Sequence, residues 1–292
     1  MPAKNSIRRL VATEPPLITP LAHDALSARL ITRAGFKSIG IGGSGMLAAR
    51  YGLPDIGLAA LGEMVTGTAD IVAATDLPVM VDGDDGYGDV KSVTHMVEVY
   101  SRMGVSAIVL EDQVREGKQP GDAGATAVVT PAAMVGKLKA AAAARSDPEM
   151  AIIARCDAFK LEGLDGAMRR AEQYLKAGAD GAFIPAVQQA ADLAAIGKRF
   201  RGAHLVAAIF EGRGTWLPPA ELREMGFSQI VCPALLMTRI VRTIDTALAQ
   251  YKAFTEGKAP MPPVEGADAA RKALEEAVMI EKWKAVHDRF QG

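Results

Sequence analysis

A short acidic segment, VDGDDGYGD at residues 81–89, holds the side chains best suited to bind a cation. It places Asp82, Asp84, Asp85 and Asp89 within eight residues. Asp82 and Asp84 are two positions apart, so on an extended chain they share one face, and the neighbouring glycines allow a tight turn. Crowded carboxylates need a counter-charge, and Mg²⁺ accepts one or two carboxylates while keeping several waters. The alternative is an Asp/Gly-rich surface turn in which one aspartate caps the next helix.

Further charged residues follow the two apolar runs that come next in the chain. Glu111 and Asp112 end the run AIVLED, and Arg155 ends the run AIIAR. If these runs are parallel strands, their carboxyl ends meet at one face, and the acids converge there. The planar fork of Arg155 suits a substrate carboxylate, and its alternative role is a salt bridge to Asp157 or Glu111.

A glycine-rich stretch offers a third candidate feature. Residues Gly42, Gly43 and Ser44 follow an earlier apolar run and are succeeded by another glycine. Backbone N–H groups in such a stretch can bind an anion. The sequence therefore predicts a cation site and an anion site at the ends of neighbouring strands.

The elements that must position these residues alternate regularly. Eight short apolar runs of strand length are separated by longer amphipathic segments, and they begin near Leu17, Ser38, Pro78, Ala107, Ala151, Gly181, His204 and Gln229. Eight strand–helix units in about 250 residues are typical of a (β/α)₈ TIM-type barrel, an α/β fold. Active sites of such barrels lie at the carboxyl ends of the strands, where the charged residues above are expected.

The chain continues beyond what a barrel needs. A helical pattern from Leu235 to Phe254 leads to a Pro-rich linker, and a single last helix is expected from about Asp268 to Phe290. We expect a catalytic barrel domain at residues 1–255 and a C-terminal linker and helical arm at residues 256–292. Such an arm either caps its own barrel or packs on a neighbouring copy.

Composition narrows the class of protein. The 292 residues are 49% hydrophobic and 23% charged, as in ordinary globular proteins. Because 33 basic residues nearly balance 34 acidic ones, we expect neither nucleic acid nor a membrane surface as a partner. Two cysteines without nearby metal-ligand spacing, and no apolar leader or span, favour a cytoplasmic protein.

Several motifs together resemble the isocitrate lyase/phosphoenolpyruvate mutase superfamily. DALSARL, YGLPD, VDGDDGYG, LEDQV, IIARCDA, GADGAF and LPPAELREMGF occur in that family's order over residues 8–241. The resemblance implies a barrel whose eighth helix is swapped between subunits, a homotetramer, and Mg²⁺, with Mn²⁺ as an alternative. It implies that Asp82 is the direct metal ligand and that Asp55, Asp84 and Glu111 hold metal-bound waters.

The residue assignments combine both lines of reasoning. Gly43 and Ser44 resemble the family's backbone donors, and Arg155 resembles its carboxylate clamp. The expected site comprises catalytic Arg155, Asp55 and Tyr87, substrate-binding Gly42, Gly43, Ser44, Arg155 and Glu211, and metal-binding Asp82, Asp84 and Glu111.

The chain departs from the family in the loop after LEDQV. The family's C–C lyases carry KKCGH or KRCGH there, with a cysteine that does acid/base work. This chain has KQPGD, with Pro120 in place of the cysteine and Asp122 in place of the histidine. Ala208 likewise replaces a family asparagine.

These departures decide which chemistry we expect. The resemblance implies a metal-stabilised enolate formed from a small 2-oxo or 2-hydroxy dicarboxylic acid. Decarboxylation needs no acid or base in the loop, whereas retro-aldol cleavage does, so we expect an oxaloacetate decarboxylase-like lyase. The alternatives are a C–C lyase of methylisocitrate or dimethylmalate type using Tyr87 or Asp122, carbon–phosphorus chemistry on phosphonopyruvate or carboxyphosphonoenolpyruvate, and a non-catalytic 2-oxo-acid binder.

Overall fold

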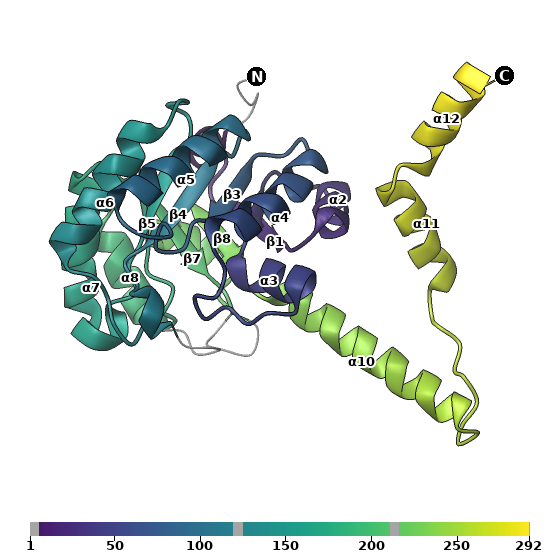
Figure 1. Cartoon of the computed structure of the whole chain (residues 1–292). Helices are drawn as coiled ribbons and strands as arrows, with labels where there is room; N and C mark the ends of the chain where they lie inside the picture. Colours follow the sequence, from purple (N-terminus) through teal and green to yellow (C-terminus); the bar gives the residue numbers. More distant parts are fainter. Residues whose placement is uncertain (1–5, 119–124, 211–215, 292) are drawn as a thin grey trace.

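The computed structural model describes residues 6–118, 125–210 and 216–291. Its eight parallel strands pair in chain order and close into a barrel, so the predicted fold is confirmed (Figure 1). The strands are β1 (Leu17–Ala22), β2 (Ile39–Ile41), β3 (Val79–Asp82), β4 (Ala107–Glu111), β5 (Ala151–Arg155), β6 (Gly181–Phe183), β7 (His204–Ala208) and β8 (Gln229–Cys232).

Helices surround the barrel and close one of its ends. They are α1 (Ile7–Thr13), α2 (Ala25–Arg33), α3 (Gly43–Tyr51), α4 (Leu61–Ala73), α5 (Val90–Arg102), the 3₁₀ turn η1 (Arg115–Gly117), α6 (Pro131–Ala144), α7 (Phe159–Lys176), α8 (Ala190–Arg199), α9 (Pro219–Met225), α10 (Leu235–Thr255), α11 (Ala267–Ala277) and α12 (Ile280–Gln291). Of the helices described, none is both long and apolar enough to cross a membrane.

The strand residues divide between two apolar cores because successive side chains point to opposite faces. Val79 and Val81 pack outward against the helices. Met80, Val109 and Ile153 fill the barrel interior, which α1 closes at the amino-terminal end. All these side chains are buried, as expected for a parallel barrel covered by helices.

The same alternation positions the charged residues. Residues two positions apart on a strand face the same side. Asp82, Glu111 and Arg155 each lie two positions after an interior residue, namely Met80, Val109 and Ile153. In register, Asp82 pairs with Val109, and Glu111 pairs with Arg155. Three neighbouring strands therefore end with a charged side chain on the interior face of the barrel.

The chain leaves the barrel along α10, which has no buried residue and projects away in Figure 1. The chain then returns, and α11 contacts α2 through an ion pair between Arg33 Nε and Glu276 Oε2 at 2.6 Å. The single helix expected from Asp268 to Phe290 is wrong, because Met279 has a left-handed φ of 57° and separates α11 from α12.

Candidate active site

The acidic segment after β3 forms a tight turn with a left-handed backbone. Asp84 and Tyr87 have φ values of 48° and 59°, and Gly86 has a φ of 85°. Asp82 Oδ1 accepts a hydrogen bond from the Asp84 N–H at 3.1 Å. Gly83 has no room for a side chain, since a Cβ there would lie 2.9 Å from the carbonyl oxygen of Val109. Local strain of this kind clusters at functional sites, where the surrounding structure fixes it.

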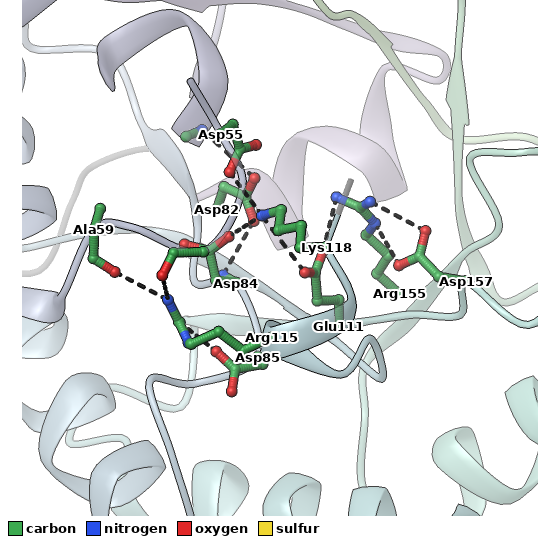
Figure 2. Close-up of polar contacts among 12 residues, drawn as sticks. Asp55, Ala59, Asp82, Asp84, Asp85, Glu111, Arg115, Lys118, Arg155 and Asp157 are labelled. Atoms are coloured by element: carbon green, nitrogen blue, oxygen red, sulfur yellow. Dashed lines mark hydrogen bonds and ion pairs between the residues drawn. The ribbon is translucent and has the colours of Figure 1, made fainter. Parts of the chain in front are cut away.

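Three carboxylates from three segments meet at the ammonium of Lys118 (Figure 2). The distances from Nζ are 2.8 Å to Asp55 Oδ1, 2.5 Å to Asp84 Oδ1 and 3.7 Å to Glu111 Oε1. Asp55 comes from the segment between α3 and α4, and Lys118 directly follows η1. Sequence reasoning placed Asp55, Asp84 and Glu111 in one site, and it missed Lys118.

Arg155 lies between two buried carboxylates on the other side of Glu111 (Figure 2). Its Nη1 is 3.0 Å from Glu111 Oε2, its Nη2 donates to Asp157 Oδ1 at 3.0 Å, and its Nε is 2.8 Å from Asp157 Oδ2. Both salt bridges considered from the sequence are therefore formed. They fix the plane of the guanidinium at the strand end, where it can also meet a substrate carboxylate.

Burial dominates the electrostatics of the site. Desolvation raises the pKa of Glu111 and that of Asp82, and the neighbouring Asp84 raises the pKa of Asp82 further. Burial alone would lower the pKa of Lys118, but the surrounding carboxylates, led by Glu111 and Asp84, raise it. Both raised carboxyl pKa values mean that the buried carboxylates of the cluster favour a nearby positive charge.

The glycine-rich stretch begins a helix rather than a loop. Gly42 precedes α3 with an extended backbone and has no side-chain cap, so the first N–H groups of the helix are available to other partners. The Gly43 N–H lies 3.5 Å from Asp82 Oδ2. Ser44 is the second residue of the same helix. The positive end of the helix dipole is therefore adjacent to the acidic cluster.

The remaining acids of the turn have structural partners. Asp85 pairs with Arg115, which also donates to the Ala59 carbonyl at 2.9 Å. Asp89 caps α5 by accepting from the Lys91 and Ser92 N–H groups. For these two aspartates, the structural interpretation of an Asp/Gly-rich turn is the one observed.

Two predicted site residues need separate comment. The Tyr87 ring lies beneath Arg115, whose Cζ is 5.1 Å from the ring centroid. Burial raises the pKa of the Tyr87 hydroxyl well above its ordinary value, so it stays protonated. Glu211 lies outside the described residues, as do Pro120 and Asp122.

The donor set fits a divalent cation held largely through water. Among the described ranges, no three Asp, Glu, His or Cys side chains converge tightly enough to ligate one ion directly. Mg²⁺ instead takes one or two carboxylates and keeps several waters, which further carboxylates can hold. Glu111 Oε2 is buried and, apart from its ion pair with Arg155 Nη1 at 3.0 Å, has no hydrogen-bond partner among the described residues, so it can accept from such a water as well.

The fold and this site define an α/β-barrel enzyme with an acidic centre at the strand ends. The family model described as phosphoenolpyruvate phosphomutase matches residues 7–252. The chain belongs to this family, within the isocitrate lyase/phosphoenolpyruvate mutase superfamily, whose lyases depend on Mg²⁺.

Named relatives are C–C lyases. The chain is 37% identical over 227 residues to 2,3-dimethylmalate lyase of Eubacterium barkeri, covering 78% of each chain. It is 31% identical over 245 residues to 2-methylisocitrate lyase of Bacillus subtilis, covering 84% of this chain and 80% of the relative.

Two solved structures show the same architecture with ligands. Oxaloacetate acetylhydrolase in complex with the product oxalate superposes with a TM-score of 0.88 at 25% identity, covering 99% of this chain and 98% of the other. A phosphonopyruvate hydrolase complex with oxalate and Mg²⁺ gives a TM-score of 0.83 at 25% identity and covers both chains completely.

Proposed function

We propose that this protein is a Mg²⁺-dependent lyase that decarboxylates a small 2-oxo dicarboxylic acid of the oxaloacetate type. The observation that supports this most directly is the charge layout of the site. Carboxylates from three segments surround the Lys118 ammonium, which marks a region that favours positive charge, while an arginine and a helix amino terminus lie beside it. A 2-oxo acid offers the complementary pattern of a metal-chelating oxygen pair and a carboxylate.

The residues that would hold the metal are Asp82 directly and Asp55, Asp84 and Glu111 through water. A bound Mg²⁺ supplies Lewis-acid stabilisation of negative charge that develops on the 2-oxygen of a substrate. Lys118 already pairs with three of these carboxylates, so the protein itself can offset part of their charge.

The protein groups around the cation position bind and orient the substrate. The Arg155 guanidinium, fixed by Glu111 and Asp157, offers charge-assisted hydrogen bonds to one carboxylate. The first turn of α3 offers the Ser44 N–H to a second anionic oxygen, beside the Gly43 N–H, which donates weakly to Asp82 Oδ2 at 3.5 Å. Such fixed donors stabilise developing charge without reorganising during the reaction.

The loop chemistry favours decarboxylation over fragment cleavage. Cleaving a 2-hydroxy acid needs a base for the hydroxyl proton and an acid for the carbanion. Pro120 has no transferable proton at the position where the family's C–C lyases have cysteine. In decarboxylation the bond between C3 and its carboxylate breaks, and the electron pair stays on the remaining 2-oxo acid fragment. Carbon dioxide leaves without acid or base assistance, and the fragment then takes a proton from solvent at C3.

A second candidate, C–C cleavage of a substituted malate or isocitrate, is favoured by the names of the relatives. Parallel assays with Mg²⁺ on oxaloacetate, methylisocitrate, dimethylmalate and phosphonopyruvate distinguish the candidates by product. Pyruvate from oxaloacetate alone supports decarboxylation. Formation of two organic acids from a substituted malate or isocitrate would contradict decarboxylation and support C–C cleavage. Release of phosphate would contradict it and support carbon–phosphorus chemistry.

We also propose that α10, the helix that follows β8, packs on a second copy of the chain, within a homotetramer of helix-swapped dimers. The 21-residue α10 buries no side chain of its own, and Ile244, Leu248 and Tyr251 are each more than half exposed. Exposed apolar surface of this extent marks an interaction site.

Changing Leu248 to Asp should disrupt this assembly, because a charge in an apolar interface has no partner. Light scattering after size-exclusion chromatography should give four chain masses for the wild type and a smaller species for the variant. A matched Lys252→Asp change on the same helix, at an exposed charged position, should leave the mass unchanged. A wild type of one chain mass would contradict the proposal.

A further inference from the structure

A buried polar cluster lies behind Arg155 and is not used by the proposed reaction. Asp112 directly follows Glu111, so its side chain leaves β4 on the opposite face, toward the helices. Asp112 Oδ1 accepts a hydrogen bond from the Asp157 N–H at 2.8 Å. Its Oδ2 accepts one from the Tyr174 hydroxyl, on α7, at 2.7 Å. The side chain of Asp157 holds Arg155, and through Asp112 the backbone of Asp157 is connected to Tyr174 on α7.

Arg170 completes this cluster. Its Nη1 is 3.5 Å from Asp112 Oδ2 and 3.2 Å from the Tyr174 hydroxyl, and it donates to the Val129 carbonyl at 2.8 Å. The Val129 N–H in turn donates to the Asp112 carbonyl at 2.8 Å. We call Asp112, Arg170 and Tyr174 the brace. The brace connects four parts of the chain: the end of β4, the segment after β5, helix α7, and Val129 in the segment that leads to α6.

Stability alone does not account for the brace. Asp112 and Tyr174 are fully buried, and Arg170 is 7% exposed. Burying such groups costs several kcal/mol per ion, and a buried ion pair is often no better than apolar residues of similar volume. What a fully bonded buried network does supply is one fixed geometry. Here that geometry is the position of the Asp157 backbone.

We propose that Asp112 and Tyr174 are positioning residues that act through Asp157 to orient the Arg155 guanidinium toward the substrate carboxylate. The inference rests on the proposed function, in which Arg155 binds that carboxylate. Among the described residues, none of the three brace residues forms a hydrogen bond or ion pair with Asp55, Asp82, Asp84 or Lys118, so the effect of the brace should fall on substrate affinity. Partners that orient metal ligands typically contribute about 10- to 100-fold to affinity or activity, and we expect the lower end of that range for a contact that orients Arg155.

The experiment uses Tyr174→Phe, which removes one hydrogen bond and keeps the ring, with Asp112→Asn as a second variant. Oxalate binding is measured by calorimetry with Mg²⁺ present, alongside KM and kcat for oxaloacetate. Tyr174→Phe should weaken oxalate binding and raise KM about tenfold, with kcat changed less than about threefold. Asp112→Asn should have the larger effect.

The control is Asp180→Asn, at the opposite end of β5. Asp180 accepts a hydrogen bond from the Ile152 N–H at 2.8 Å and pairs with Arg8 and Arg145, so it matches Asp112 in chemistry but not in location. Asp180→Asn should lower Tm without changing oxalate affinity.

The outcomes separate the two proposals. Wild-type affinity in Tyr174→Phe, or an equal loss in Asp180→Asn, would overturn the positioning role and leave the proposed function standing. Failure of the wild type to bind oxalate with Mg²⁺ would overturn the proposed function and this inference with it.

Discussion

Replacing Asp82 with alanine is expected to abolish metal-dependent turnover. Asp82 ends β3 on the barrel interior, accepts the Asp84 N–H and lies beside the amino terminus of α3. In the proposed site it is the one direct metal ligand, so its loss removes Lewis-acid stabilisation of several kcal/mol. That corresponds to a fall in kcat/KM of about 1,000-fold or more. The measurement is turnover as a function of Mg²⁺ concentration.

A matched control lies seven residues further along the same turn. Asp89 caps α5, and its exposed side chain accepts two backbone N–H groups. Asparagine is an equally good helix cap, so Asp89→Asn should keep wild-type Mg²⁺ dependence. Retained metal-dependent turnover in Asp82→Ala would show that the metal is not held at the end of β3.

Changing Arg155 to lysine should raise KM by about 30- to 150-fold. The expected loss is about 2–3 kcal/mol, in the upper part of the range for hydrogen bonds to charged groups, because an ammonium cannot reproduce the planar contacts to Asp157 and Glu111 while also meeting a carboxylate. Removing the charge altogether would leave the buried Asp157 without its cation and Glu111 with only the Lys118 contact, which is why lysine is the informative substitution. Steady-state kinetics on oxaloacetate measure the effect.

The control for Arg155→Lys is the same change at Arg145, which pairs with Asp180 and donates to the Met150 carbonyl at the other end of β5. Arg145→Lys should leave KM unchanged. An equal rise in both variants would indicate a general distortion of β5 and would remove Arg155 from the substrate site.

The sequence predicts the strand ends of this site well because barrel geometry is periodic. The alternation of side chains in β3, β4 and β5 determines that Asp82, Glu111 and Arg155 face the interior at one end. The apolar runs indicate the shared strand ends, whereas the interior face is known only from the structure, because both faces of these strands are apolar.

Residues on irregular segments were harder to predict. Lys118 comes seven residues after the end of β4, and its position depends on η1 and on Arg115, which is held by Asp85 and the Ala59 carbonyl. The path of such a segment is set by tertiary contacts that no local pattern encodes. The signal available was a lone lysine just downstream of an acidic strand end. The left-handed Met279 that breaks the last helix was equally hidden, because nothing in its local pattern favours that conformation.

The central claim is metal-dependent decarboxylation, and the most direct measurement is a carbon balance on oxaloacetate. Labelled oxaloacetate is incubated with enzyme and Mg²⁺, and products are quantified by NMR and by trapped carbon dioxide, with Asp82→Ala as the background for spontaneous decay. We predict equal amounts of pyruvate and carbon dioxide, above the Asp82→Ala background and lost on chelation of the metal. Oxalate with acetate as products, or no products above that background, would contradict the account.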